Sequence, residues 1–393
     1  MRQMSKWMCG AALAVALAGC STVRVVRPTA EGPAAPAPVA DSQWGFDETR
    51  AGGERDGYRP PTKLAVLLPM SGELSTAAGS VRDGFLAGYY AERRTRPELV
   101  FYDTAGTPSG AIVARDRAIA EGADQILGPL GRDEVSTLFN AAPAVPLLAL
   151  NRGNTAPPDN AADFSLAPED EGRAAAAYAL ARNARRVLVL SNGDDHARRS
   201  VEAFRTALEA GGGTIAGILA ITGEEPGDQT PALRAAASGE GGIDAVLFAL
   251  RGSEARLLTP QLFASGLGQK LLVANSQLAS GTGKPDEDRA LDGIAFTTET
   301  WTLRGVPGLP SPSTLAADLP TARGPAARLF AFGYDAWLLS AHLQHLAADP
   351  AASVEGATGR LSLDAAGNVL RVPAWATFRD GAVAPLAGAG AGG

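Results

Sequence analysis

The sequence is poor in cysteine, histidine and positive charge, and these shortages exclude several classes of protein. Its 393 residues include two cysteines, too few for a disulfide-stapled scaffold or a zinc site built from thiolates. Lysine and arginine total 35 against 42 aspartates and glutamates, which gives a net charge of −7. Such a chain has no positive field for polyanions, so we expect no nucleic-acid partner.

The motifs of common catalytic centres are missing as well. Ser71 lies in Pro-Met-Ser-Gly, without the first glycine of a G-x-S-x-G nucleophile elbow. His342 and His345 share one face of a predicted helix and have no further ligand beside them, so we interpret them as a partly buried face and not as a zinc site. The string at 281–285 lacks the spacing of a phosphate-binding loop. We therefore expect no enzyme, no catalytic residues, no metal and no cofactor.

Three acidic clusters each precede a predicted helix. They are Glu169-Asp170-Glu171, Asp194-Asp195 and Asp286-Glu287-Asp288. Carboxylates are favourable at the positive end of a helix dipole, and nothing pairs these acids across a site. We interpret them as helix starts and not as acid–base catalysts.

The first twenty residues have the features of a targeting signal. Arg2 and Lys6 precede an apolar run from Met8 to Ala18, too short to span a bilayer, which leads into Leu-Ala-Gly-Cys20. That ending resembles a bacterial lipobox, which predicts a signal peptide over 1–19 and an acylated Cys20. An ordinary signal peptide with an incidental cysteine remains the alternative. Ser21 at the next position is similar to the sorting context of outer-membrane lipoproteins.

Residues 20–62 combine the acylated cysteine with a segment rich in proline, alanine and glycine. This composition predicts a tether, with an average span of roughly 35 to 40 Å if it is flexible. The globular body is predicted over 63–386, and 387–393 is predicted to be a disordered tail.

From Lys63 onward, short apolar runs alternate with stretches of helical spacing. The runs are Leu64–Leu68, Leu99–Tyr102, Gln125–Leu127, Leu147–Leu150, Val187–Leu190, Ile215–Ile221, Ala245–Leu250, Leu271–Ala274 and Ile294–Thr297. Runs that are apolar throughout are typical of parallel strands buried on both faces. The fold class we predict is α/β, with two doubly wound parallel-sheet lobes joined by a hinge. Near the end of the chain, 361–378 predicts short antiparallel strands.

The lobes are expected to exchange the chain three times. Lobe 1 is predicted over about 63–166 and 293–347, and lobe 2 over about 167–292 and 348–386, with crossings near Leu166, Gly293 and Ala348.

A cleft between such lobes would bind a ligand at the carboxyl ends of the strands. The residues placed there are Ser71, Gly72, Thr104, Asn151, Asp194 and Asn275. Small polar residues suit a small polar ligand, but ordinary strand–helix turns use the same residue types. Both interpretations stay open.

Several strings carry a family resemblance over almost all of 63–386. They are Lys63–Gly72, Val81–Phe85, Tyr102–Thr104, Gly122–Leu130, Leu148–Asn151, Phe164–Glu171, Phe332–Ala336 and Gly356–Leu363. With them the body resembles the type I periplasmic binding protein fold and, more specifically, is similar to the penicillin-binding-protein activator lipoproteins of the LppC/LpoA group.

The resemblance implies an outer-membrane lipoprotein, facing the periplasm, that binds and activates a class A penicillin-binding protein and so regulates peptidoglycan synthesis. The best-known members carry a long N-terminal helical-repeat domain, where this sequence predicts only the tether. We expect a monomer with an acyl membrane anchor. The alternative is a lipid-anchored solute-binding protein for an amino acid or small peptide. A third hypothesis, a hydrolase that acts on cell-wall material, is supported by no set of candidate catalytic residues in the sequence.

Overall fold

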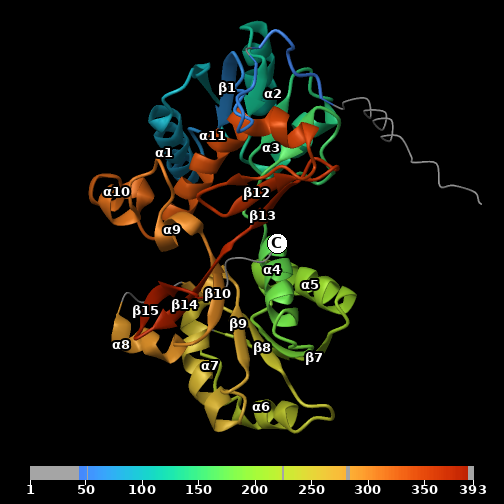
Figure 1. Ribbon diagram of the computed structural model, residues 1–393, viewed down its shortest axis with the longest axis vertical. Coiled ribbons are helices and arrows are strands. Elements are labelled where there is room, and N and C mark those ends of the chain that lie inside the picture. Colours follow the sequence, from blue (N-terminus) through green and yellow to red (C-terminus); the bar gives the residue numbers. More distant parts are fainter. Residues whose placement is uncertain (1–43, 51, 224, 280–283, 388–393) are drawn as a thin grey trace, which may run out of the picture. The chain divides into compact units, whose positions relative to one another are not determined.

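The computed structural model describes residues 44–50, 52–223, 225–279 and 284–387. All of them belong to one compact unit, Ser42–Gly393. Two sheets, one parallel and one mostly parallel, form the two lobes, and helices cover both faces of each (Figure 1). The fold class predicted from the sequence is confirmed.

Lobe 1 is built on five parallel strands in the order β2-β1-β3-β4-β5. Their bounds are β1 Lys63–Leu68, β2 Glu98–Asp103, β3 Gln125–Leu127, β4 Leu147–Ala149 and β5 Ala161–Asp163. The helices are α1 Ser75–Ala91, α2 Pro108–Ala120, α3 Arg132–Asn140 and α11 Ala326–Ala348. Alternate residues of β1 enter two separate cores, one with α1 and α11 and the other with α2 and α3. Burial on both faces explains why the β1 run is apolar throughout.

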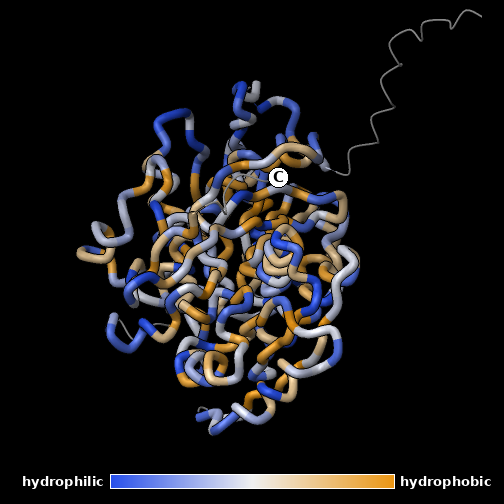
Figure 2. Tube along the Cα trace, turned by 60° about the horizontal axis from the view of Figure 1, so that its bottom comes forward, coloured by the Kyte–Doolittle hydropathy of each residue, from blue (hydrophilic) through white to orange (hydrophobic). Residues whose placement is uncertain are grey.

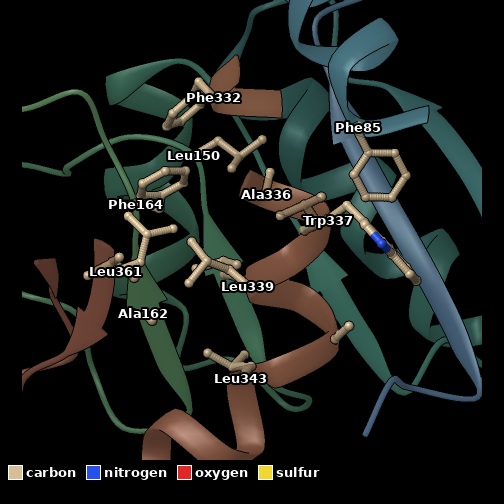
Figure 3. Close-up of a cluster of buried hydrophobic side chains, with 14 of the residues drawn as sticks. Phe85, Leu150, Ala162, Phe164, Phe332, Ala336, Trp337, Leu339, Leu343 and Leu361 are labelled. Carbon is tan, nitrogen blue, oxygen red and sulfur yellow. The ribbon is translucent and has the colours of Figure 1, made fainter. Parts of the chain in front are cut away.

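Aromatic rings fill the core between α11 and the sheet of lobe 1. Phe85 meets Trp337 edge to face at 5.9 Å between ring centroids, and Phe164 stacks on Phe332 at 4.4 Å (Figure 3). Phe164 directly follows β5, so this stack fixes the end of that strand against α11. Hydrophobic segments gather inside the molecule while turns are hydrophilic (Figure 2).

Lobe 2 is built on seven strands in the order β15-β14-β10-β9-β8-β6-β7. Their bounds are β6 Arg186–Ser191, β7 Thr214–Ala220, β8 Ala245–Ala249, β9 Leu271–Ala274, β10 Ala295–Thr298, β14 Ala374–Arg379 and β15 Ala382–Pro385. Strands β6 to β10 run parallel, while β14 and β15 complete the sheet antiparallel. The helices are α4 Pro168–Leu180, α5 Asp195–Ala210, α6 Thr230–Ala237 and α7 Gly252–Ala264, with short turns η1 Ser276–Ala279, α8 Pro285–Asp288 and η2 Arg289–Leu291.

A third sheet lies against lobe 1. It is antiparallel, in the order β11-β12-β13, with bounds Val354–Glu355, Arg360–Leu363 and Val369–Val372. Leu361, Leu363 and Val369 of this sheet pack into the lobe 1 core. Before it come the short elements α9 Thr300–Arg304, α10 Pro312–Asp318 and η3 Pro320–Ala322.

The chain passes between the lobes at three places. These are the segment from Asp163 to Pro168, Glu299 after β10, and Pro373 between β13 and β14. The first agrees with the crossing predicted near Leu166. The predicted boundaries at Gly293 and Ala348 differ from the structure, because β10 belongs to the lobe 2 sheet and β11 to β13 stay with lobe 1.

The predicted tether also ends earlier than residue 62. Trp44 and Phe46 stack on each other and pack against the lobe 1 core, and Arg50 and Tyr58 are buried. Residues 44–62 are therefore part of the folded body, apart from Ala51, which lies outside the described residues. The signal peptide, Cys20, the rest of the tether, and 388–393 of the predicted tail also lie outside them.

Candidate functional site

Ser71, Gly72 and Thr104 meet at the carboxyl ends of β1 and β2. The Ser71 hydroxyl donates to Asp103 Oδ2 at 2.7 Å, and Asp103 Oδ1 accepts the backbone N–H groups of Met70 and Ala105. The Ala105 N–H and then the Ser71 hydroxyl hold the pKa of Asp103 below its usual range. Gly72 takes a φ of +84°, which favours glycine. Ser71 remains exposed, whereas Thr104 is fully buried and its backbone N–H donates to Leu68 O.

The Asn151 side chain forms hydrogen bonds with the backbone of its own loop after β4 and of the loop after β3. Its Nδ2 donates to Leu130 O at 2.9 Å, and its Oδ1 accepts the Arg152 N–H at 2.9 Å. Leu130 follows the cis peptide bond between Gly128 and Pro129. Asn151 thus holds the loop after β3 against the loop after β4. This is a role that residues of ordinary strand–helix turns have.

Asp194 and Asn275 belong to a polar cluster at the carboxyl ends of β6, β8 and β9. Asp194 caps α5 by accepting the Ala197 N–H at 2.8 Å, and its Oδ2 lies 3.4 Å from both Arg251 Nη2 and Gln277 Nε2. Burial tends to raise the pKa of Asp194, but these donors lower it overall. Asn275 Oδ1 accepts the Gln277 N–H at 3.2 Å.

Asn275 Nδ2 is the one amide of the predicted set that has no hydrogen-bond partner among the described residues. Asn275 is 2% exposed, so the group is shielded from water. Buried donors of this kind normally find an acceptor. The amide therefore has capacity for a ligand oxygen.

The structure gathers the six predicted residues into separate groups. Ser71, Gly72 and Thr104 lie together in lobe 1, Asp194 and Asn275 lie together in lobe 2, and Asn151 bonds to its neighbouring loops. Two shallow surface hollows stand out elsewhere. One of about 260 Å³ lies along β2 and α2, and one of about 280 Å³ lies beside β6, β7 and α6. Neither coincides with the six residues.

The lobes are joined by a buried ion cluster that the sequence did not reveal. We call it the Glu171 cluster, and its members are Glu171, His196, Ser276, Arg328 and Arg371. Glu171 lies in the first turn of α4 and its side chain is 0% exposed. Arg328 Nη2 donates to Glu171 Oε1 at 2.6 Å, and the N–H and hydroxyl of Ser276 donate to the two carboxylate oxygens at 2.9 and 2.8 Å.

Charge compensation keeps Glu171 ionised. Burial tends to raise its pKa, but Arg328, the neighbouring His196 at 3.3 Å and the charge of Arg371 lower it well below the usual range. The prediction that Glu169, Asp170 and Glu171 start a helix is confirmed, since they form the first turn of α4. The arginine partners of Glu171 lie far along the chain, so only the three successive acids were visible in the sequence.

The histidines and acids offer no metal site among residues 44–50, 52–223, 225–279 and 284–387. His342 is buried on α11, where Nδ1 lies 2.9 Å from Leu338 O, and burial lowers its pKa. This agrees with the predicted helix face. Within the same ranges, each helix is too short or too polar to cross a membrane.

The chain was compared with known families and structures. The family model described as "LppC putative lipoprotein" matches residues 57–222 and 231–381. The "Penicillin-binding protein activator LpoA" of Pasteurella multocida is 26% identical over 329 residues, covering 83% of this chain and 55% of that protein. The chain thus spans about half the length of this relative.

Solved structures share the fold. The "LpoA (YraM) C-domain from Haemophilus influenzae, a regulator of PBP1A" superposes with a TM-score of 0.71 at 23% identity, over 82% of this chain and 99% of that one. A "putative branched-chain amino acid ABC transporter" from Chromobacterium violaceum superposes at 0.65 with 27% identity, over 81% of this chain and 100% of that one. Because the family model matches most of the chain and spans both lobes, the chain belongs to the LppC lipoprotein family.

Proposed function

We propose that this protein binds and activates a class A penicillin-binding protein and so regulates peptidoglycan synthesis. The observation that carries the proposal is the family match through both lobes, together with a relative named as an activator over 83% of the chain. A named relative in the fold comparison is a regulator of PBP1A.

The proposal places the protein on the outer membrane, facing the periplasm, as an acylated monomer. Cys20 would carry the acyl chains, and two or more chains suffice for stable anchoring. Because the folded body begins by residue 44, the tether would span about 20–43, shorter than the sequence predicted. Such a chain would stretch to at most about 85 Å and average nearer 25 to 30 Å. Reach toward an inner-membrane synthase would then depend on the synthase's own extension into the periplasm.

The test is a paired binding and cross-linking assay. Residues 21–393, without the acyl group, would be titrated against a purified class A synthase from the same cell, and peptide cross-links would be counted with and without the protein. Saturable binding with more cross-links per glycan is expected. A penicillin-blocked synthase serves as the control, because it should bind without forming cross-links. Absence of binding well above micromolar concentration would overturn the proposal.

A second function has one observation in its favour. The buried Asn275 Nδ2 lacks an acceptor among the residues that the structure describes, and a ligand carboxylate would supply one. The solute-binding alternative therefore predicts that an amino acid or short peptide raises the melting temperature of the native protein and not that of Asn275→Leu. No shift with any of the twenty amino acids would remove the amino acid form of this alternative.

A further inference from the structure

We propose that the Glu171 cluster is a clamp that fixes the angle between the two lobes, so that the protein holds one arrangement and does not open and close around a ligand. The inference stands on the geometry of the junction and does not depend on the proposed function. The three crossings are short connections, which by themselves would permit rotation of the lobes.

The clamp draws its members from both lobes. Glu171 on α4, His196 on α5 and Ser276 after β9 belong to lobe 2. Arg328 stands in the first turn of α11, and Arg371 lies on β13, whose sheet packs against lobe 1. Arg371 Nη2 lies 3.5 Å from Glu171 Oε1, and the Arg371 side chain is 1% exposed. Opening the lobes would leave these buried charges without their partners.

Arg328 also binds the second crossing. Its Nε lies 2.8 Å from Glu299 Oε1, where the chain leaves β10 for lobe 1. Glu299 is 6% exposed. One guanidinium from lobe 1 therefore fastens both α4 and a crossing segment, as the planar fork of arginine allows.

Hydrogen bonds through Thr358 and Asp335 hold the Arg371 side chain in its orientation. Arg371 Nη1 donates to Thr358 O at 3.3 Å, and Thr358 is itself held by Asp335 on α11. Asp335 accepts the Ala357 and Thr358 N–H groups at 2.5 and 2.7 Å and the Thr358 hydroxyl at 2.6 Å. The same helix that supplies Arg328 thus positions the loop that aims Arg371.

The two preceding acids of α4 repeat the pattern more weakly. Arg152 of lobe 1 lies 3.5 Å from Glu169, and Arg371 lies 4.0 Å from Asp170. Both acids also have a closer partner within lobe 2, Arg199 at 2.8 Å from Glu169 and Arg173 at 2.5 Å from Asp170. Three successive acids in the first turn of α4 therefore each face an arginine from lobe 1.

The test measures the distance between the lobes. Spin labels would be attached through Val113→Cys on α2 and Glu202→Cys on α5, whose side chains are exposed, with Cys9 and Cys20 replaced by serine. Double electron–electron resonance should give one narrow distribution of the distance between the two labels in the otherwise native protein. Glu171→Gln should add a second distance and raise the open population at least about tenfold, since it removes the buried charge that Arg328 and Arg371 share.

Arg328→Gln gives a second, independent reading. Its side chain is 27% exposed at the rim of the cluster, so water can enter to solvate the Glu171 and Glu299 carboxylates that lose their guanidinium, and the variant should fold even if Glu171→Gln does not. Glu209→Gln, an exposed acid at the end of α5, makes the same charge change as Glu171→Gln outside the cluster and should leave the distribution unchanged. A broad distribution in the native protein, or an unchanged one in a folded Arg328→Gln, would overturn the clamp.

Discussion

Asp163 shows at the scale of one residue how the junction controls protonation. It ends β5 and is 2% exposed, and its nearest cation, Arg152, lies 3.7 Å away through Nε. Burial raises the pKa of Asp163 to about 6, and Asp364 and Asp170 add to the shift while Arg152 opposes it. Between about pH 4 and pH 6, the folded protein therefore holds a proton on Asp163 that the unfolded chain releases.

This shift predicts a pH-dependent gain from Asp163→Asn. Because the folded pKa is raised, the native residue stabilises the fold below about pH 4 and loses that contribution as pH rises to about 6. Relative to the native protein, the variant should gain up to about 3 kcal/mol between pH 4 and pH 7. Urea unfolding of both proteins at the two pH values measures the difference. Asp159→Asn, which changes an exposed acid nearby, is the control. An equal change in the free energy of unfolding of the native protein and of Asp163→Asn between the two pH values would contradict the prediction.

At the scale of elements, two glycines set the contact of α1 with α11. A Cβ on Gly84 would lie 1.9 Å from Phe330 O, and one on Gly333 would lie 1.9 Å from Val81 O. These contacts are with backbone, which cannot move aside as a flexible side chain would. Only glycine lets the two helices approach this closely.

Gly84→Ala should therefore force the helices apart and lower the free energy of unfolding by about 1 to 3 kcal/mol. Gly79→Ala is a matched control in the same helix, because its Cβ meets nothing within 4 Å. That control should gain about 0.5 to 1 kcal/mol from the better helix propensity of alanine. Chemical denaturation of the two variants checks the opposite signs, and a loss in both would show that the close approach is not the cause.

The elements that the sequence predicted are those with long apolar runs. All nine runs became strands, and the antiparallel strands after residue 360 are also confirmed. Strand β5 was missed because Ala161-Ala162-Asp163 is short and has small side chains, and its strand form depends on pairing with β4. The arginine partners of Glu171 were missed for a related reason, because their pairing follows from tertiary packing and leaves no spacing to recognise.

At the scale of the whole molecule, the limits of the folded body were misjudged at its N-terminal end. Proline and glycine in 44–62 predicted a tether, yet Trp44, Phe46 and Tyr58 of this segment pack into or against the lobe 1 core. Arg50 is 5% exposed, with Nε 2.7 Å from Asp124 Oδ2 and Nη1 3.3 Å from Gln125 Oε1. Tyr58 is 3% exposed and its hydroxyl donates to Thr95 O. Composition describes local flexibility, and it does not report these few anchoring side chains.

The segment should accordingly contribute to stability. A protein that begins at Trp44 should exceed one that begins at Lys63 by about 3 kcal/mol in the free energy of unfolding, because removal of Arg50 leaves Asp124 and Gln125 without their buried partner. A protein that begins at Ser21 should match the one that begins at Trp44, since the intervening composition predicts a tether. Urea denaturation of the three proteins tests both statements. Arg50→Met in the longest protein should reproduce most of the loss, and equal stability of all three would show that 44–62 adds nothing to the fold.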